Sequence, residues 1–142
     1  MIELHPQLAK DAVLLGQFLL SKLLLVKDAN YPWLILVPAR EGISEIFQLD
    51  EADQQQLQRE SSCIAQLLAE EFNADKINIG ALGNIVPQLH IHHIVRYESD
   101  IAWPGPVWGA HPAKDYTDAE LTAIVEKVKK ALATQFDFLP EP

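Results

Sequence analysis

Residues 87–96 read PQLHIHHIVR and carry three of the five histidines of the chain. Polar and apolar residues alternate here, which predicts a strand whose side chains point to opposite faces in turn. One face would carry the polar side chains of Gln88, His90 and His92. The other face would carry Leu89, Ile91, His93 and Val95. Because an unpaired buried polar atom costs about 1–3 kcal/mol, we expect the polar face to meet a ligand.

The longer stretch GNIVPQLHIHHIVR, residues 83–96, resembles the active-site strand of the histidine triad (HIT) family. In that family, His, apolar, His, apolar, His, apolar, apolar follows a glycine-containing loop. The resemblance places His90 at the nucleophile and His92 at the third histidine. Gln88 stands where the first histidine is usual, and this is a departure. In the family the backbone carbonyl of that position binds the nucleophile's other ring nitrogen, which implies that Gln88 need not abolish activity.

His93 points to the opposite face of the predicted strand, where the family usually has an apolar residue. A buried histidine needs hydrogen-bond partners for its ring nitrogens. We therefore expect His93 to be a hydrogen-bonded structural residue and leave it out of the site.

Composition limits the class of protein. The 142 residues suffice for one domain, residues 1–142, while a formal net charge of −9 argues against a general binder of nucleic-acid backbones. One cysteine, Cys63, excludes an internal disulfide framework and a multi-cysteine zinc site. The N-terminus lacks the basic start of a signal peptide, and the most apolar segment, residues 12–26, is short for a membrane span. We expect a cytoplasmic protein that binds neither membranes nor nucleic acids.

Several apolar runs are candidate strands. The periodicity of residues 13–18 and 22–26 does not separate strand from helix, and the HIT resemblance implies two antiparallel strands. Residues 32–38, PWLILVP, have the composition of a strand, and Trp33 within them is expected to belong to the core. Residues 76–79 alternate polar and apolar side chains, which predicts another strand.

Two long helices are expected after the first strands. Asp50 is a good N-cap for the first helix, and Thr117 with Glu120 forms a capping box for the second. The phenylalanines of the tail, Phe136 and Phe138, are expected to pack against the domain. Together these elements predict an α+β fold with a mostly antiparallel sheet and two main helices. The resemblance implies a HIT-like sheet of five to six strands.

Four further residues are candidates for substrate binding. Asp28 matches the position of an acidic residue that contacts the ribose in HIT proteins, and a turn-forming aspartate is the alternative. Asn84 matches a polar residue near the phosphates, and a loop-capping asparagine is the alternative. Trp103 and Trp108 lie in a segment rich in Pro and Gly, where they could stack on a planar base or pack on the domain itself.

The resemblance implies a hydrolase or transferase that cleaves at the α-phosphate of a purine nucleotide conjugate, such as a dinucleoside polyphosphate or nucleoside phosphoramidate. His90 would form a covalent nucleotidyl-histidine, which needs no metal and no cofactor, and His92 would stabilise the phosphoryl oxygens. The resemblance also implies a homodimer that pairs through a sheet edge such as residues 76–79.

The His-x-His pattern alone leaves two other functions open. A non-catalytic nucleotide-binding protein would explain Gln88 as a decayed triad position. A metal-dependent enzyme would use His90 and His92 as ligands, but it would need further ligands from elsewhere in the chain.

Overall fold

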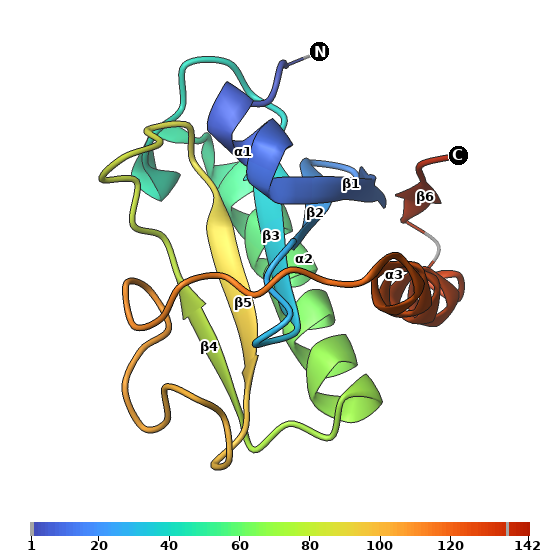
Figure 1. Cartoon of the computed structure of the whole chain (residues 1–142). Helices are drawn as coiled ribbons and strands as arrows, with labels where there is room; N and C mark the ends of the chain where they lie inside the picture. The colour runs from blue at the N-terminus through green and yellow to red at the C-terminus, as the bar shows by residue number, and fades with distance from the viewer. Residues whose placement is uncertain (1, 136) are drawn as a thin grey trace.

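An antiparallel sheet organises the chain (Figure 1). The computed structural model describes residues 2–135 and 137–142, and in this part of the chain the sheet has six strands in the order β4-β5-β3-β2-β1-β6. Their bounds are Ala12–Gln17 (β1), Ser21–Val26 (β2), Trp33–Pro38 (β3), Lys76–Gly80 (β4), Ile91–Arg96 (β5) and Leu139–Pro140 (β6). Each neighbouring pair is antiparallel, so the predicted α+β fold with a mostly antiparallel sheet is confirmed.

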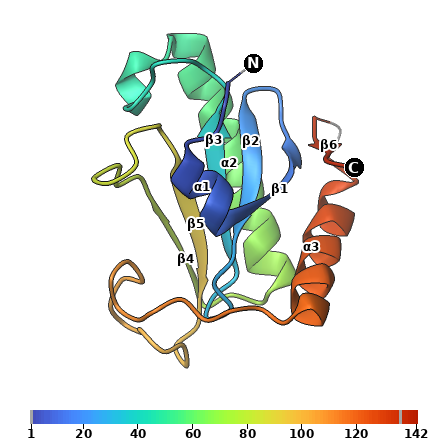
Figure 2. The ribbon, with the colours of Figure 1, turned by 45° about the horizontal axis from the view of Figure 1, so that its top comes forward.

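The helices cover both faces of this sheet. Their bounds are Pro6–Asp11 (α1), Ile46–Gln48 (the 3-10 helix η1), Glu51–Glu71 (α2) and Asp118–Leu132 (α3). Figure 2 shows α1 on one face and α2 on the other, with α3 at the end of the sheet formed by β1 and β6. No helix of the described residues is both long and apolar enough to cross a membrane.

Both long helices begin where the sequence predicts. The Asp50 carboxylate accepts a hydrogen bond from the Asp53 amide, which satisfies one of the unpaired donors of the first turn of α2. The Thr117 hydroxyl accepts from the Glu120 amide, and the Glu120 carboxylate accepts from the Thr117 amide in return. This reciprocal pair is the predicted capping box of α3.

The register of β3 and β5 separates the histidines. His93 lies opposite Leu34 on the face that packs against α2, whereas His92 lies opposite Ile35 on the face that α1 partly covers. The α2 side holds the main core, which includes Leu15, Leu23, Leu25, Leu34, Leu36, Ile64, Leu68, Ile91 and Val95. Successive residues of β5 therefore serve opposite faces, as the alternating pattern predicts.

The predicted strand over residues 87–96 was too long, because β5 begins at Ile91. The amide of Leu89 donates a hydrogen bond to the carbonyl of Ile43, outside the ladder between β3 and β5. The side chain of Gln88 accepts from the amide of His5. Residues 87–90 therefore bond to the N-terminal segment and the loop before α2, and Gln88 and His90 precede the strand.

A C-terminal strand that the sequence did not predict closes the β1 end of the sheet. Gly16 of β1 pairs with Pro140, and a Cβ atom at Gly16 would lie 2.6 Å from Cζ of Phe138. Only a glycine allows this close approach. Phe138 is buried and its ring centroid lies 5.2 Å from that of Phe18, whereas Phe136 lies outside the described residues.

Candidate active site

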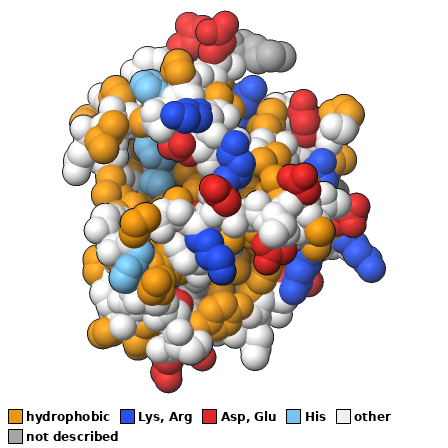
Figure 3. All heavy atoms as spheres, viewed as in Figure 1, with side chains coloured by type: hydrophobic (Ala, Val, Ile, Leu, Met, Phe, Trp, Pro, Cys, Tyr) orange, Lys and Arg blue, Asp and Glu red, His pale blue; other side chains and the backbone are white. Residues whose placement is uncertain are grey.

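The rings of His90 and His92 lie edge to face, with their centroids 4.9 Å apart and their planes at 67°. His90 directly precedes β5, and His92 lies within that strand. Only 7% and 8% of their surfaces are exposed. Figure 3 shows histidine side chains among hydrophobic ones along the sheet face that α2 does not cover. The structure therefore brings together the two histidines that the sequence singles out.

The backbone carbonyl of Gln88 orients His90. Nδ1 of His90 lies 2.8 Å from this oxygen. A carbonyl only accepts hydrogen bonds, so Nδ1 must carry the hydrogen and donate it. In the neutral ring Nε2 then carries a lone pair, which is the form that a nucleophile requires.

The side chain of Gln88 points away from His90 toward the N-terminal segment. Its Oε1 accepts from the His5 amide at 2.7 Å, and its Nε2 donates to the Glu3 carbonyl at 3.0 Å. Gln88 thus uses its carbonyl for His90 and its amide group to hold residues 3–5. The sequence predicts that Gln88, His90 and His92 share a face that meets a ligand. In the structure the amide group of Gln88 bonds to the N-terminal segment and does not face a ligand.

Trp33 is a neighbour of His92 that the sequence analysis missed. Its Nε1 lies 2.9 Å from Nδ1 of His92, and the two ring centroids are 5.5 Å apart. Trp33 packs against two clusters of the core, as predicted, and its indole nitrogen also contacts the site. The signal lies in the register: Trp33 is opposite Ile94 and therefore diagonal to His92 on the same sheet face.

Burial keeps His92 neutral. Removal of the ring from water, followed by the positive charges that His90 and His93 can carry, lowers the pKa of His92 to about 3. His92 is therefore uncharged at neutral pH, and it can act on a substrate only as a neutral hydrogen-bonding group.

His93 is a structural residue, as its position on the opposite face predicts. The ring is fully buried, with Nδ1 3.1 Å from the Ile91 carbonyl and Nε2 2.7 Å from the Ser61 hydroxyl of α2. Burial lowers the pKa of His93 to about 4 despite the backbone hydrogen bond, which acts in the other direction. Both ring nitrogens have partners, and the residue links β5 to α2.

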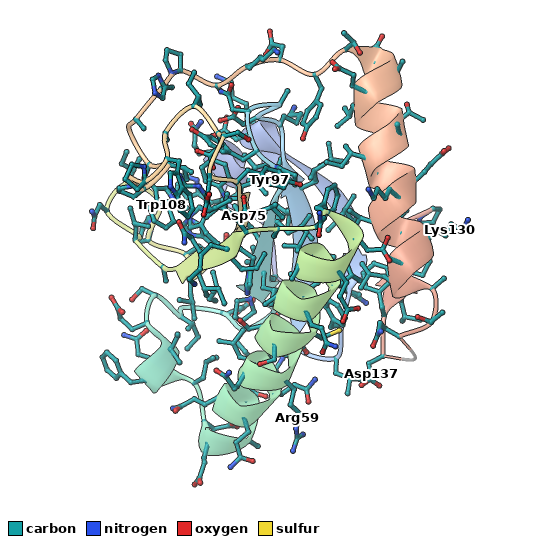
Figure 4. The ribbon with its side chains drawn as sticks, turned by 90° about the horizontal axis from the view of Figure 1, so that it is seen from below. Arg59, Asp75, Tyr97, Trp108, Lys130 and Asp137 are labelled. Carbon is teal, nitrogen blue, oxygen red and sulfur yellow. The ribbon has the colours of Figure 1, made fainter. Side chains whose placement is uncertain are left out.

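The two tryptophans of the loop after β5 have different neighbours. The ring of Trp103 lies 5.6 Å from the guanidinium carbon of Arg96, so its observed contact is with the domain itself. The ring of Trp108 lies edge to face with His92 at 5.4 Å, and a Cβ atom at Gly80 would lie 3.1 Å from it. Figure 4 shows Trp108 on the side of the molecule away from α3, close to β4. Trp108 is therefore a wall of the candidate site.

Asp28 and Asn84 differ in their surroundings. The Asp28 carboxylate is buried and accepts hydrogen bonds from the amides of Asn30 and Lys114. These bonds fix the turn between β2 and β3 and hold the segment that leads to α3, which favours a turn-forming aspartate. Burial, aided by the charges of Asp28 and Glu120, also raises the pKa of the nearby Tyr116 to about 12. Asn84 is exposed in the loop after β4.

The described residues hold no cluster of three or more His, Cys, Asp or Glu side chains arranged to bind a metal. Nδ1 of His5 accepts from the Gln7 amide as the N-cap of α1, and His111 is exposed in the segment before α3. His90 and His92 therefore lack a third protein ligand within the described chain.

Known proteins are similar to this chain in sequence and in fold. The HIT domain family matches residues 7–99. Solved histidine triad proteins from Marinobacter aquaeolei VT8 and Bradyrhizobium japonicum are 47% and 45% identical, with TM-scores of 0.91 and 0.89. The matches cover 94% and 91% of this chain and 97% and 96% of theirs.

A histidine triad protein from Sinorhizobium meliloti 1021 is 42% identical, with a TM-score of 0.90 over 93% of this chain and 98% of its own. No curated protein matches the sequence significantly. The family match spans more than half of the chain, and the structural matches span nearly all of it. The chain belongs to the HIT domain family.

Proposed function

We propose that this protein is a nucleotide-phosphate hydrolase or transferase that forms a covalent nucleotidyl-histidine at His90. The substrate would be a purine nucleotide conjugate cleaved at its α-phosphate, either a dinucleoside polyphosphate or a nucleoside phosphoramidate. HIT domain proteins are generally nucleotide-binding hydrolases or transferases, which supports the class of reaction. The observation that carries the proposal is the hydrogen bond from Nδ1 of His90 to the Gln88 carbonyl, because it leaves Nε2 with a free lone pair.

The proposed first step is a displacement at the α-phosphorus. The lone pair on Nε2 of His90 forms a P–N bond, and the bond to the leaving group breaks with its electron pair on that group, which takes a proton from the solvent where it departs as an amine. The ring gains positive charge as the P–N bond forms. The Gln88 carbonyl, 2.8 Å from Nδ1, then accepts a stronger, charge-assisted hydrogen bond.

Water or another acceptor completes the proposed reaction. The acceptor oxygen forms a new bond to phosphorus and, in the case of water, gives up a proton to the solvent, while the P–N bond breaks and its electron pair returns to Nε2 of His90. Water as acceptor releases a nucleoside monophosphate, and another nucleophile gives group transfer. Neither step uses a metal or an organic cofactor, and we place the reaction in the cytoplasm.

Trapping of the covalent species tests this proposal directly. The protein is mixed with adenosine phosphoramidate or diadenosine polyphosphate and quenched in alkali, in which the P–N bond of the adduct is stable. It is then digested and examined by mass spectrometry. We expect an adenylate group on the peptide that carries His90. His90→Ala should give no adduct, whereas His93→Gln is a matched control in the same peptide, because His93 faces the opposite side of the sheet.

Two other functions make different predictions in this experiment. A non-catalytic nucleotide-binding protein, suggested by Gln88 at the first triad position, would bind adenosine monophosphate without turnover or adduct. A metal-dependent enzyme would lose its turnover with a chelator and regain it with a divalent cation. Turnover that chelators abolish, without any adduct, would refute the nucleophilic role of His90.

We also propose that two copies pair through β4, as the family resemblance implies. The support is that β4 is an edge strand of the sheet and that its residue Ile79 is 51% exposed. The loop that follows carries two more exposed apolar side chains, Leu82 and Ile85. Light scattering at micromolar concentration should give twice the chain mass of 15.9 kDa. A mass of one chain would contradict the dimer.

A further inference from the structure

We propose that Trp33 is a positioning residue that fixes His92 in the Nε2–H tautomer, so that His92 offers an N–H donor to the phosphoryl oxygens during attack by His90. The use of this donor rests on the proposed function, whereas the tautomer itself does not.

The contact between the two rings determines where the hydrogens lie. Nε1 of Trp33 is 2.9 Å from Nδ1 of His92. An indole nitrogen can only donate, so Nδ1 of His92 must accept and carries no hydrogen. A neutral imidazole carries its hydrogen on one nitrogen only, which places it on Nε2. Protonation of Nδ1 would set two donors against each other, so the contact also opposes the charged form of His92.

Aromatic side chains hold the two rings in this arrangement. Trp33 is the first residue of β3, and the ring of Tyr31 lies edge-on to it at 6.2 Å. On its other side His92 meets Trp108, edge to face at 5.4 Å. His90 completes the surroundings of His92 at 4.9 Å. The titratable groups that act on His92 through their charge are His90 and His93, and both oppose its protonation.

His90 and His92 consequently have opposite tautomers. Nδ1 of His90 donates to the Gln88 carbonyl, whereas Nδ1 of His92 accepts from Trp33. Nε2 therefore carries a free lone pair in His90 and a hydrogen in His92. Neither Nε2 atom has a hydrogen-bond partner within the described residues, and neither is among their fully buried unpaired polar atoms. Both are available to a ligand.

This pairing suits attack on a phosphate. A lone pair on one ring can reach the phosphorus while an N–H group on its neighbour donates to an oxygen that gains charge. A carbonyl in place of the indole would have given His92 a lone pair on Nε2, which repels phosphate oxygens. A single hydrogen bond from β3 therefore converts the second histidine from an acceptor into a donor.

Nitrogen NMR of the imidazole rings tests the tautomer in the full-length protein. With 15N-labelled histidine, the shifts and long-range proton couplings of Nδ1 and Nε2 distinguish a protonated from an unprotonated ring nitrogen. We expect His92 to show an unprotonated Nδ1 and a protonated Nε2, and His90 the reverse. In Trp33→Phe the indole donor is lost while the aromatic ring is kept, so the His92 shifts should move toward an average of both tautomers and its pKa should rise.

Trp108→Phe is the matched control for the spectra. Trp108 also contacts His92, but its Nε1 is buried without a hydrogen-bond partner among the described residues. Loss of that N–H group should leave the His92 tautomer unchanged. A protonated Nδ1 of His92 in the unaltered protein would overturn the proposal. This spectrum decides the tautomer even if Trp33→Phe folds poorly.

Kinetics test whether the donor is used. Loss of a whole oxyanion donor costs about 100- to 1,000-fold in kcat, so a donor that is only misdirected in Trp33→Phe should cost roughly tenfold, with a smaller change in KM. An averaged tautomer with unchanged kcat would refute the positioning role. Lack of turnover in the unaltered protein would instead refute the proposed function, and the NMR result would still decide the assignment of Trp33.

Discussion

The guanidinium of Arg96 and the carboxylate of Asp100 form a buried two-point ion pair, with Nε to Oδ2 at 2.8 Å and Nη2 to Oδ1 at 3.1 Å. The Asp100 carboxylate also accepts from the amides of Tyr97, Ala102 and Trp103. Nη1 of Arg96 donates to the side chain of Asn78 on β4. The loop that carries both tryptophans is therefore built on this pair.

Asp100→Asn should lower the free energy of unfolding. Burial raises the pKa of Asp100, but the hydrogen bonds from Arg96 and from the amides of Tyr97 and Trp103, together with the charge of Arg96, outweigh burial and leave the pKa below its usual value. Loss of the charge leaves Arg96 buried without a counter-ion, which costs about 3–5 kcal/mol. Urea unfolding measures this loss. Asp53→Asn is the control, because its pair with the largely exposed Arg40 should contribute less than about 1 kcal/mol.

His90→Ala should abolish turnover almost completely, and His92→Ala should reduce it less. Loss of a covalent nucleophile lowers kcat by several orders of magnitude, whereas loss of an oxyanion donor lowers it by about 100- to 1,000-fold. Single-turnover assays with a labelled nucleotide conjugate measure both. Equal losses in the two variants would mean that His90 has no role beyond that of His92.

Gln88→His should keep or raise activity, because the backbone carbonyl that binds His90 is retained. The same change removes the amide group that bonds to Glu3 and His5, so the free energy of unfolding should fall by about 1 kcal/mol. Kinetics and urea unfolding of the same preparation separate these effects. Loss of activity at full stability would show that the glutamine side chain takes part in the reaction.

Trp103→Ala and Trp108→Ala should have different effects. Trp103 stacks on Arg96, so its removal should mainly lower the melting temperature. Trp108 contacts His92, so its removal should raise KM or lower kcat more than it lowers stability. Thermal unfolding and steady-state kinetics provide both readouts. A kinetic defect confined to Trp103→Ala would mean that this ring, and not Trp108, faces the substrate.

The free energy of unfolding should decrease as the pH falls below about 6.5. Burial lowers the pKa of His92 to about 3 and that of His93 to about 4, so the unfolded chain binds protons in this window that the folded chain does not. Each histidine contributes up to about 1.4 kcal/mol per pH unit. Urea unfolding between about pH 7 and pH 5 measures the slope. His93→Gln should show a smaller slope, and an unchanged slope would contradict its lowered pKa.

Local signals predicted much of the fold. The N-caps Asp50 and Thr117 begin the long helices because they satisfy donors within their own first turns. The alternation of residues 91–96 sorts His92 and His93 to opposite faces because a strand has a period of two. The residues preceding Ile91 are not part of the strand, because the Leu89 amide bonds to the distant Ile43 carbonyl. No local pattern in the sequence reveals this bond.

Two contacts that the sequence did not predict are long-range. Trp33 and His92 are 59 positions apart and meet only through the pairing of β3 with β5. The buried carboxylate of Glu60 on α2 accepts from the amides of Leu20 and Ser21 at the turn between β1 and β2. A charged residue on a helix usually faces water, so its sequence context gives no sign of this bond.

The short strand β6 limits how copies of this chain can associate. It covers β1 at Gly16 and Gln17, and Pro140 has no amide hydrogen to offer a further strand. The opposite edge, β4, has no such cover within the described residues. A sheet that can be extended at one edge alone gives a closed two-fold pair, whereas a sheet open at both edges can grow into a filament. The short strand β6 therefore opposes extension of the sheet at the part of β1 that it covers.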